Sequence, residues 1–286
     1  YATNTAEQVA YVINHSGAEI VFVSNRNQYE KLLRVRDQLS NVKQVVSFDR
    51  FLYLPELPVI SLYQLSEISH PLTDDERDEI EQEIAQITSD DLATIIYTSG
   101  TTGVPKGVML TQANFLFDAH YGVEKLGGMR SAETFLSFLP LSHVLERTAG
   151  YYAPLMFGSH IAFAESVDKV VENISEVRPT MMVSVPRLFE KIYSRIYENV
   201  HLMNPGKRKL FHKAVDIGRA YVYRKYIERK PTGFLGLKYR LMDRLVFNKI
   251  RQRFGGRLRM CISGGAPLDK KINEFLWIIG IPTCEG

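Results

Sequence analysis

Residues 97–107 read YTSGTTGVPKG and place three glycines, three threonines and one serine around a single lysine, Lys106. The apolar run LATIIYT (92–98), which leads into them, is typical of a buried strand. A strand followed by such small residues presents backbone N–H groups and hydroxyls without bulky side chains, and donors of this kind suit phosphate oxygens. We therefore predict a phosphate-binding loop with Lys106 as its mobile positive charge. The alternative is an ordinary turn with a surface lysine.

The loop differs from the P-loop of the nucleoside triphosphatases, whose pattern is G-x-x-x-x-G-K-[ST]. Pro105 precedes Lys106, where that pattern requires glycine, and Gly107 follows it, where the pattern requires serine or threonine. We therefore expect a phosphate site of a different type.

Strand-like apolar runs alternate with helical patterns along the rest of the chain. This alternation predicts an α/β fold with mostly parallel sheets flanked by helices. The expected strands are 19–25, 44–48, 92–98, 134–141, 159–165, 180–186, 257–263 and 281–284. The expected helices are 5–16, 28–39, 108–127 with Thr111 as a possible cap, 187–200 and 269–280.

The composition indicates a large globular chain that binds no nucleic acid. It has 286 residues, of which 45% are hydrophobic, and a net charge of only +3. Cys261 and Cys284 both lie in short apolar runs, which argues against a disulfide scaffold and favours a reducing, cytoplasmic location. No apolar run approaches the ~18–20 residues of a membrane-spanning helix. No spacing of histidine, cysteine and carboxylate residues predicts a metal site.

Charge is unevenly distributed along the chain. Residues 71–91 contain nine acidic residues and one arginine, which predicts a solvated helix. Residues 207–259 contain seventeen lysines and arginines against three acidic residues, interleaved with aromatic and aliphatic side chains. We interpret this basic stretch as a surface that contacts the anionic inner face of a membrane, or an acidic carrier protein. The alternative is a set of solvated helices whose aromatic residues belong to the core.

Together with three further segments, the loop resembles the signature of the adenylate-forming enzymes. These segments are FLPLSHVLERTAGYY (138–152), PTMMVSVPRLFEKIY (179–193) and ISGGAPL (262–268), in the order that the family has them. The resemblance covers essentially the whole chain. It is strongest to the branch of long-chain fatty acyl-CoA synthetases.

The resemblance implies that residues 1–286 form part of the large N-terminal adenylation domain. The front and the end of that domain, with its Mg²⁺- and ribose-binding residues, are expected outside the chain. So is the small C-terminal domain with its catalytic lysine, and we therefore expect residues 1–286 alone to be inactive.

The implied activity is that of a long-chain fatty acid–CoA ligase with ATP, Mg²⁺ and CoA. A fatty carboxylate attacks the α-phosphate of ATP to give acyl-AMP and pyrophosphate, and the CoA thiol then takes the acyl group. Two alternatives remain: an acyl-acyl carrier protein synthetase, and a non-catalytic module that binds nucleotide or acyl groups.

The resemblance also implies roles for individual residues. His143 and Lys106 are expected to be catalytic, with His143 near the carboxylate; the alternative for His143 is a structural role. Gly264, Gly265 and Ala266 are expected to pack against adenine, unless they form a simple strand-to-helix turn. The β- and γ-phosphates are expected to bind Thr98, Ser99, Gly100, Thr101, Thr102, Gly103 and Lys106.

Overall fold

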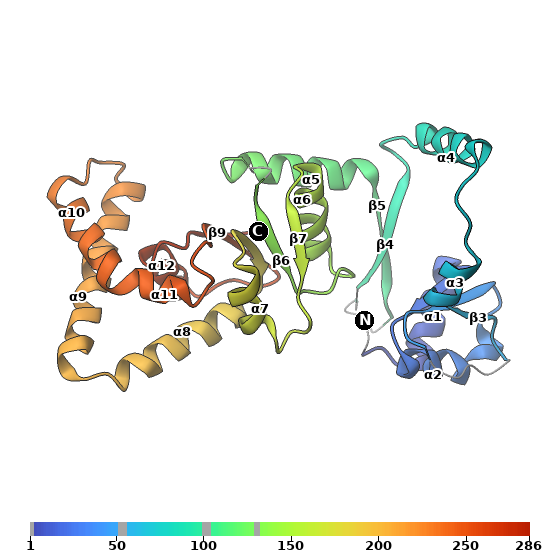
Figure 1. Cartoon of the computed structure of the whole chain (residues 1–286), viewed down its shortest axis with the longest axis horizontal. Coiled ribbons are helices and arrows are strands. Elements are labelled where there is room, and N and C mark those ends of the chain that lie inside the picture. The colour runs from blue at the N-terminus through green and yellow to red at the C-terminus, as the bar shows by residue number, and fades with distance from the viewer. Residues whose placement is uncertain (1–2, 51–55, 99–103, 129–131) are drawn as a thin grey trace. The chain divides into compact units, whose positions relative to one another are not determined.

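The computed structural model describes residues 3–50, 56–98, 104–128 and 132–286, shown as coloured ribbons in Figure 1. The chain divides into two compact units, Tyr1–Asn114 and Phe115–Gly286. The predicted phosphate-loop residues Ser99–Gly103 lie outside the described residues.

The first unit contains a three-stranded parallel sheet in the order β1-β2-β3. Its first helix begins and ends where the sequence predicts. The Thr5 side chain accepts a hydrogen bond from the Gln8 amide, and Gly17 ends the helix with a φ of 69° that glycine adopts readily. The elements are α1 (Ala6–Ser16), β1 (Ile20–Val23), α2 (Arg26–Arg34), η1 (Arg36–Gln38), β2 (Gln44–Ser47), β3 (Val59–Ser61), α3 (Leu62–Ile68) and α4 (Asp74–Gln86).

The acidic stretch forms α4, and none of the residues of this helix is buried. Thr73 and Glu76 close a reciprocal capping box at its start, where three acidic residues also face the positive end of the helix dipole. The prediction of a solvated helix is confirmed.

Strands β4 (Leu92–Thr98) and β5 (Lys106–Thr111) form an antiparallel pair, unlike the other sheets. The predicted helix 108–127 is therefore wrong at its start, because 106–111 pair along the whole length of β4. The helix is α5 (Gln112–Lys125), and Thr111 caps it as predicted: its hydroxyl accepts from the Asn114 amide at 3.4 Å.

The second unit is built on a five-stranded parallel sheet in the order β10-β9-β8-β6-β7. Alternate residues of these strands point to opposite sides of the sheet, and both faces are covered. Phe135, Met181 and Val183 face the segment after β6, whereas Leu136 and Met182 join the larger helical core. The strands are β6 (Thr134–Ser137), β7 (His160–Phe163), β8 (Met181–Ser184), β9 (Met260–Ser263) and β10 (Thr283–Glu285). The mostly parallel α/β fold predicted from the sequence is confirmed.

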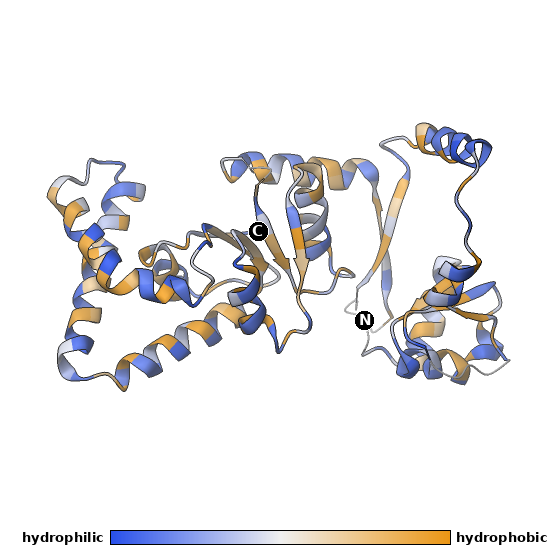
Figure 2. Cartoon of the chain, in the orientation of Figure 1, coloured by the Kyte–Doolittle hydropathy of each residue, from blue (hydrophilic) through white to orange (hydrophobic). Residues whose placement is uncertain are grey.

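The helices of this unit pack around a core that includes Phe211, Phe247 and Phe275. Gly218 permits close contact in this core, since a Cβ there would lie 2.5 Å from Ile278 Cγ2. Hydrophobic residues recur along α8 between hydrophilic ones (Figure 2). The helices are α6 (Ala153–Met156), α7 (Val170–Val177), α8 (Pro186–His201), α9 (Pro205–Val222), α10 (Gly233–Met242), α11 (Asn248–Gln252) and α12 (Lys270–Ile278), with π-helical turns η2 (Glu146–Tyr152), η3 (Tyr223–Ile227) and η4 (Asp243–Phe247).

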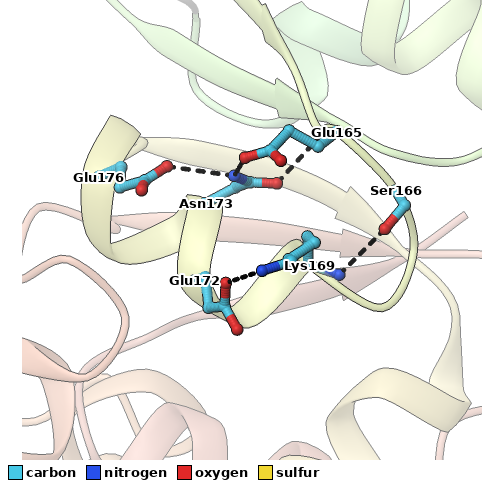
Figure 3. Close-up of polar contacts among 6 residues, drawn as sticks. All are labelled: Glu165, Ser166, Lys169, Glu172, Asn173 and Glu176. Carbon is cyan, nitrogen blue, oxygen red and sulfur yellow. Dashed lines mark hydrogen bonds and ion pairs between the residues drawn. The ribbon is translucent and has the colours of Figure 1, made fainter.

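Polar contacts fix the connection from β7 to α7 (Figure 3). Asn173 is only 5% exposed, and its side-chain NH₂ group donates to the Glu165 carboxylate at 3.0 Å and to the Glu176 carboxylate at 3.1 Å. In return, the backbone N–H of Glu165 donates to the side-chain oxygen of Asn173. Lys169 pairs with Glu172 one turn along. These polar contacts join the end of β7 to α7, which also buries Val170 and Ile174 in the core.

Candidate functional site

The strand order reverses between the neighbouring strands β6 and β8, although all five strands run parallel. The connection that leaves β6 leads to β7 on one side, whereas the connection that leaves β8 leads to β9 on the other. In α/β sheets, ligands bind outside the carboxyl ends of the strands at such a point. Ser137, Ser184 and Ser263 end β6, β8 and β9, and all three are buried.

A pocket of about 570 Å³ opens near this edge of the sheet. Its volume lies within the range of about 300–1,000 Å³ that is typical of small-molecule sites. Most of its lining is apolar, and its polar residues include Asp118, His143, Thr148 and Glu285. The lining comes from α5 and the residue after it, from 143–153, and from the ends of β9 and β10 with the residues that follow them.

His143 lies on this pocket, in the segment that follows β6. Its Nδ1 atom accepts a hydrogen bond from the Leu145 amide at 3.2 Å, so the neutral ring carries its proton on Nε2. The exposed ring is thus oriented by the backbone N–H of Leu145, two residues along the chain. His143 therefore lies at the pocket, where the sequence predicts it, and it also makes the local hydrogen bond that a structural role would require.

The predicted adenine-binding turn follows β9, and Gly265 lines the same pocket. Gly264 donates its N–H to the Ser184 carbonyl at 3.0 Å, and a Cβ on Gly264 would lie 2.8 Å from both methyl groups of Leu145. Gly265 has a φ of +80°, a conformation that favours glycine. The close approach therefore requires glycine at 264, and the backbone turn requires it at 265. Ala266 is exposed.

Glu285 of β10 fixes the far end of this turn. Its two carboxylate oxygens accept hydrogen bonds from the Leu268 amide and from the Asn273 side chain, both at 3.2 Å. No sequence motif pointed to this residue. The signal that was available is its position directly after the expected strand 281–284.

Glu146 is the second residue that the sequence analysis missed. Its neighbour Arg147 makes a local ion pair the simple interpretation of the sequence, with no chemistry assigned to it. In the structure the Glu146 side chain is fully buried, and the Arg147 Nε–H donates to the Leu141 carbonyl. Neither carboxylate oxygen has a hydrogen-bond partner of good geometry among the described residues. Burial raises the pKa of Glu146 from 4.5 to about 7, and the nearby Ser137 hydroxyl offsets part of this shift.

The helix around Glu146 is shaped to hold this carboxyl group. Glu146 begins the π-helical turn η2, a rare geometry that occurs often at functional sites. A Cβ on Gly150, four residues along, would lie 2.6 Å from the carboxyl group. Gly150 was therefore the available sequence signal for a buried side chain at 146.

The two described ends of the predicted phosphate loop, Thr98 and Lys106, lie opposite each other in the β4–β5 pair, and both are exposed. Beside Thr98, the Tyr97 hydroxyl lies 2.8 Å from His15 Nδ1 of α1, and the Tyr97 ring packs across from Gly107. A Cβ on Gly107 would lie 3.2 Å from that ring. The glycine of the triplet Pro105-Lys106-Gly107 thus makes room for an aromatic side chain at the base of the loop.

The described residues contain no group of three or more histidine, cysteine and carboxylate side chains arranged to hold a metal ion. Cys261 and Cys284 are both free thiols, and burial raises the pKa of each.

The fold and the pocket define an α/β chain with a mostly apolar pocket near the carboxyl edge of a parallel sheet. The family model of the AMP-binding enzymes matches residues 1–285, and the chain belongs to this family.

Curated relatives cover the whole of this chain. It is 32% identical to a long-chain-fatty-acid–CoA ligase of Homo sapiens (ACSBG2) and 32% identical to one of Mycobacterium tuberculosis (FadD15). It is 33% identical to the peroxisomal long chain acyl-CoA synthetase 6 of Arabidopsis thaliana. The chain spans 42%, 46% and 39% of these relatives, respectively.

Solved structures share the fold at lower identity. The benzoate CoA ligase of Burkholderia xenovorans aligns with 99% of this chain and 43% of its own, with a TM-score of 0.59 and 20% identity. The A domain of a carboxylic acid reductase from Segniliparus rugosus, solved with AMP and a co-purified carboxylic acid, aligns with 100% of this chain and 43% of its own. Its TM-score is 0.62 and its identity 18%.

We expect Gly264→Val to destabilise the second unit by about 1–3 kcal/mol, because the new side chain must displace Leu145 and approach the Gly286 carbonyl. Urea unfolding followed by Trp277 fluorescence measures this effect, since Trp277 is the sole tryptophan. Gly122→Ala is the matched control: Gly122 lines the same pocket, and a Cβ there would meet nothing within 4 Å. Equal stability of the Gly264→Val variant and the wild type would contradict the close packing of the turn.

Proposed function

We propose that this chain is part of a long-chain fatty acid–CoA ligase, which activates a fatty acid with ATP as acyl-AMP and then forms the CoA thioester. The observation that carries the proposal is the shared pocket. His143 and the turn at Gly265, which come from segments far apart in sequence, line one mostly apolar pocket at the carboxyl edge of the sheet. The names of the curated relatives support a fatty acid as the substrate.

Each part of the site has a proposed task. The apolar lining suits an alkyl chain, because the burial of each CH₂ group is worth about 0.8 kcal/mol. Gly264, Gly265 and Ala266 offer a surface of small residues and backbone to a flat purine, and His143 lies near the carboxylate.

The loop from Thr98 to Lys106 would hold the β- and γ-phosphates. Pyrophosphate leaves with growing negative charge, and fixed N–H, hydroxyl and lysine donors stabilise that charge where it develops. Mg²⁺ would neutralise the triphosphate. Because the described residues include no cluster of metal ligands, we assign it to none of them.

The acceptor of the acyl group is tested on the full-length protein that contains this chain. The protein is loaded with acyl-AMP from palmitate and ATP, and then offered either CoA or a holo-acyl carrier protein. We expect palmitoyl-CoA to form and the carrier protein to stay unmodified. Transfer to the carrier protein alone would replace this proposal with a carrier-protein synthetase. Failure to form acyl-AMP in the loading step would leave a non-catalytic module that binds nucleotide or acyl groups.

A further inference from the structure

The α10–η4 region exposes a continuous apolar stripe. Phe234, Leu237, Leu241 and Leu245 recur at intervals of three and four residues and therefore share one face of the helix. They are 69%, 60%, 55% and 43% exposed, respectively. On the other side of the helix, Tyr239 and Met242 pack in the core of the second unit. The stripe is thus a second apolar face that the fold does not bury.

Basic residues flank this stripe. Lys238 lies beside it, with its Nζ 4.7 Å from the centre of the Phe234 ring, and Arg240 and Arg244 are exposed on the same two turns. From residue 229 to residue 268 the sequence contains ten lysines and arginines but only one acidic residue, Asp243. Asp243 is itself paired with Arg251. Lys230, at the start of this range, pairs with Glu228 just before it. The charge around the stripe is nevertheless strongly positive, because basic residues far outnumber acidic ones.

We propose that the Phe234–Leu245 face is a docking surface for an anionic lipid bilayer, with the helix lying in the plane of the interface. A surface helix with an apolar stripe and flanking lysines and arginines has the character of an interfacial helix. Its basic side chains can reach the headgroups while their stems cover apolar surface. No helix in the described ranges is long and apolar enough to cross a bilayer. When this face binds, the helix lies flat on the membrane. This binding does not depend on the reaction proposed above.

Protein partners fit this face less well than lipid does. The cores of protein–protein interfaces are depleted in charged residues and especially in lysine. An acidic carrier protein would match the charge but would leave the stripe of large apolar side chains without a specific occupant. Binding of an acidic protein to this face is therefore a competing outcome of the test.

The test is co-sedimentation of the full-length protein with vesicles of phosphatidylcholine and phosphatidylglycerol in a ratio of about 70:30, or of phosphatidylcholine alone. We expect the wild type to bind the anionic vesicles about ten-fold or more tightly, with an affinity that falls as salt rises. The triple variant Phe234→Ser, Leu237→Ser and Leu241→Ser is expected to lose about ten-fold or more of this affinity. The double variant Lys238→Glu and Arg244→Glu is expected to lose a similar factor.

A matched triple variant controls for the loss of exposed apolar area. Val167→Ser, Val171→Ser and Leu202→Ser alter residues that are 67%, 45% and 87% exposed in the same unit but outside 207–259. This variant is expected to bind like the wild type, and far-UV circular dichroism reports that every variant is folded.

Four outcomes would overturn the proposal. They are a wild type that does not sediment with vesicles, equal binding to both vesicle types, unchanged binding of the stripe variant, and stripe-dependent binding to an acidic carrier protein without vesicle binding.

Discussion

In the full-length protein, Lys106→Ala is expected to slow acyl-adenylate formation by about 30- to 1,000-fold while leaving thioester formation from preformed acyl-AMP nearly unchanged. The loss of one charged donor to a developing anion costs about 2–4 kcal/mol. Lys106 is exposed at the start of β5, opposite Thr98, so its ammonium is free to reach phosphate oxygens at the loop. The two half-reactions are measured separately, by fatty acid-dependent ATP–pyrophosphate exchange and by CoA consumption with synthetic acyl-AMP.

Lys43→Ala provides the control for the loss of a lysine. Lys43 lies in the same unit and pairs with Glu19 at 2.8 Å on the surface, so its replacement is expected to leave both rates unchanged. Equal losses in the two half-reactions of Lys106→Ala would show that Lys106 does not act on pyrophosphate departure.

Glu146→Gln is expected to remove a pH dependence from the stability of the second unit. The folded-state pKa of Glu146 is raised to about 7 from its ordinary value of 4.5, so the folded state holds a proton that the unfolded state has lost. The wild type therefore loses stability as the pH rises from 4.5 to 7, by up to about 3 kcal/mol. The glutamine side chain has a similar shape but does not ionise, and the variant is expected to be the more stable protein at pH 8.

The measurement is urea unfolding at pH 5 and pH 8, followed by the fluorescence of Trp277. At each pH, the free energy of unfolding of the variant is compared with that of the wild type. The change in this difference between pH 5 and pH 8 reports the titration of Glu146. Glu190→Gln, at an exposed position of α8, is expected to keep the wild-type slope. If the free energy of unfolding of Glu146→Gln still fell with pH as steeply as that of the wild type, another group would be responsible for the pH dependence.

The parallel sheet of the second unit was predictable because its strands are short apolar runs between helical patterns. The expected helix 5–16 likewise agrees with α1, since the capping by Thr5 and the left-handed backbone of Gly17 are local properties of those residues. The start of α5 was not predictable in the same way. The segment 106–111 continues the apolar pattern of the helix, and only its pairing with β4 makes it a strand.

Parts of the site depend on contacts that no local pattern reports. The contact between His15 and Tyr97 joins residues 82 positions apart. The burial of Glu146 is hidden by the charged neighbour Arg147, which makes a surface ion pair look plausible. His143 and the turn at Gly265 were found through their family motifs, and the structure brings them to one pocket. The loop residues Ser99–Gly103 lie outside the described residues, so their phosphate contacts remain a prediction.

The most direct measurement is ATP–pyrophosphate exchange by the full-length protein with palmitate or benzoate as the carboxylic acid, followed by addition of CoA. The account predicts exchange that requires palmitate, with little exchange on benzoate, and palmitoyl-CoA as the product once CoA is present. Exchange on benzoate but not on palmitate would contradict the fatty acid assignment. The absence of exchange with any carboxylic acid would contradict adenylation itself.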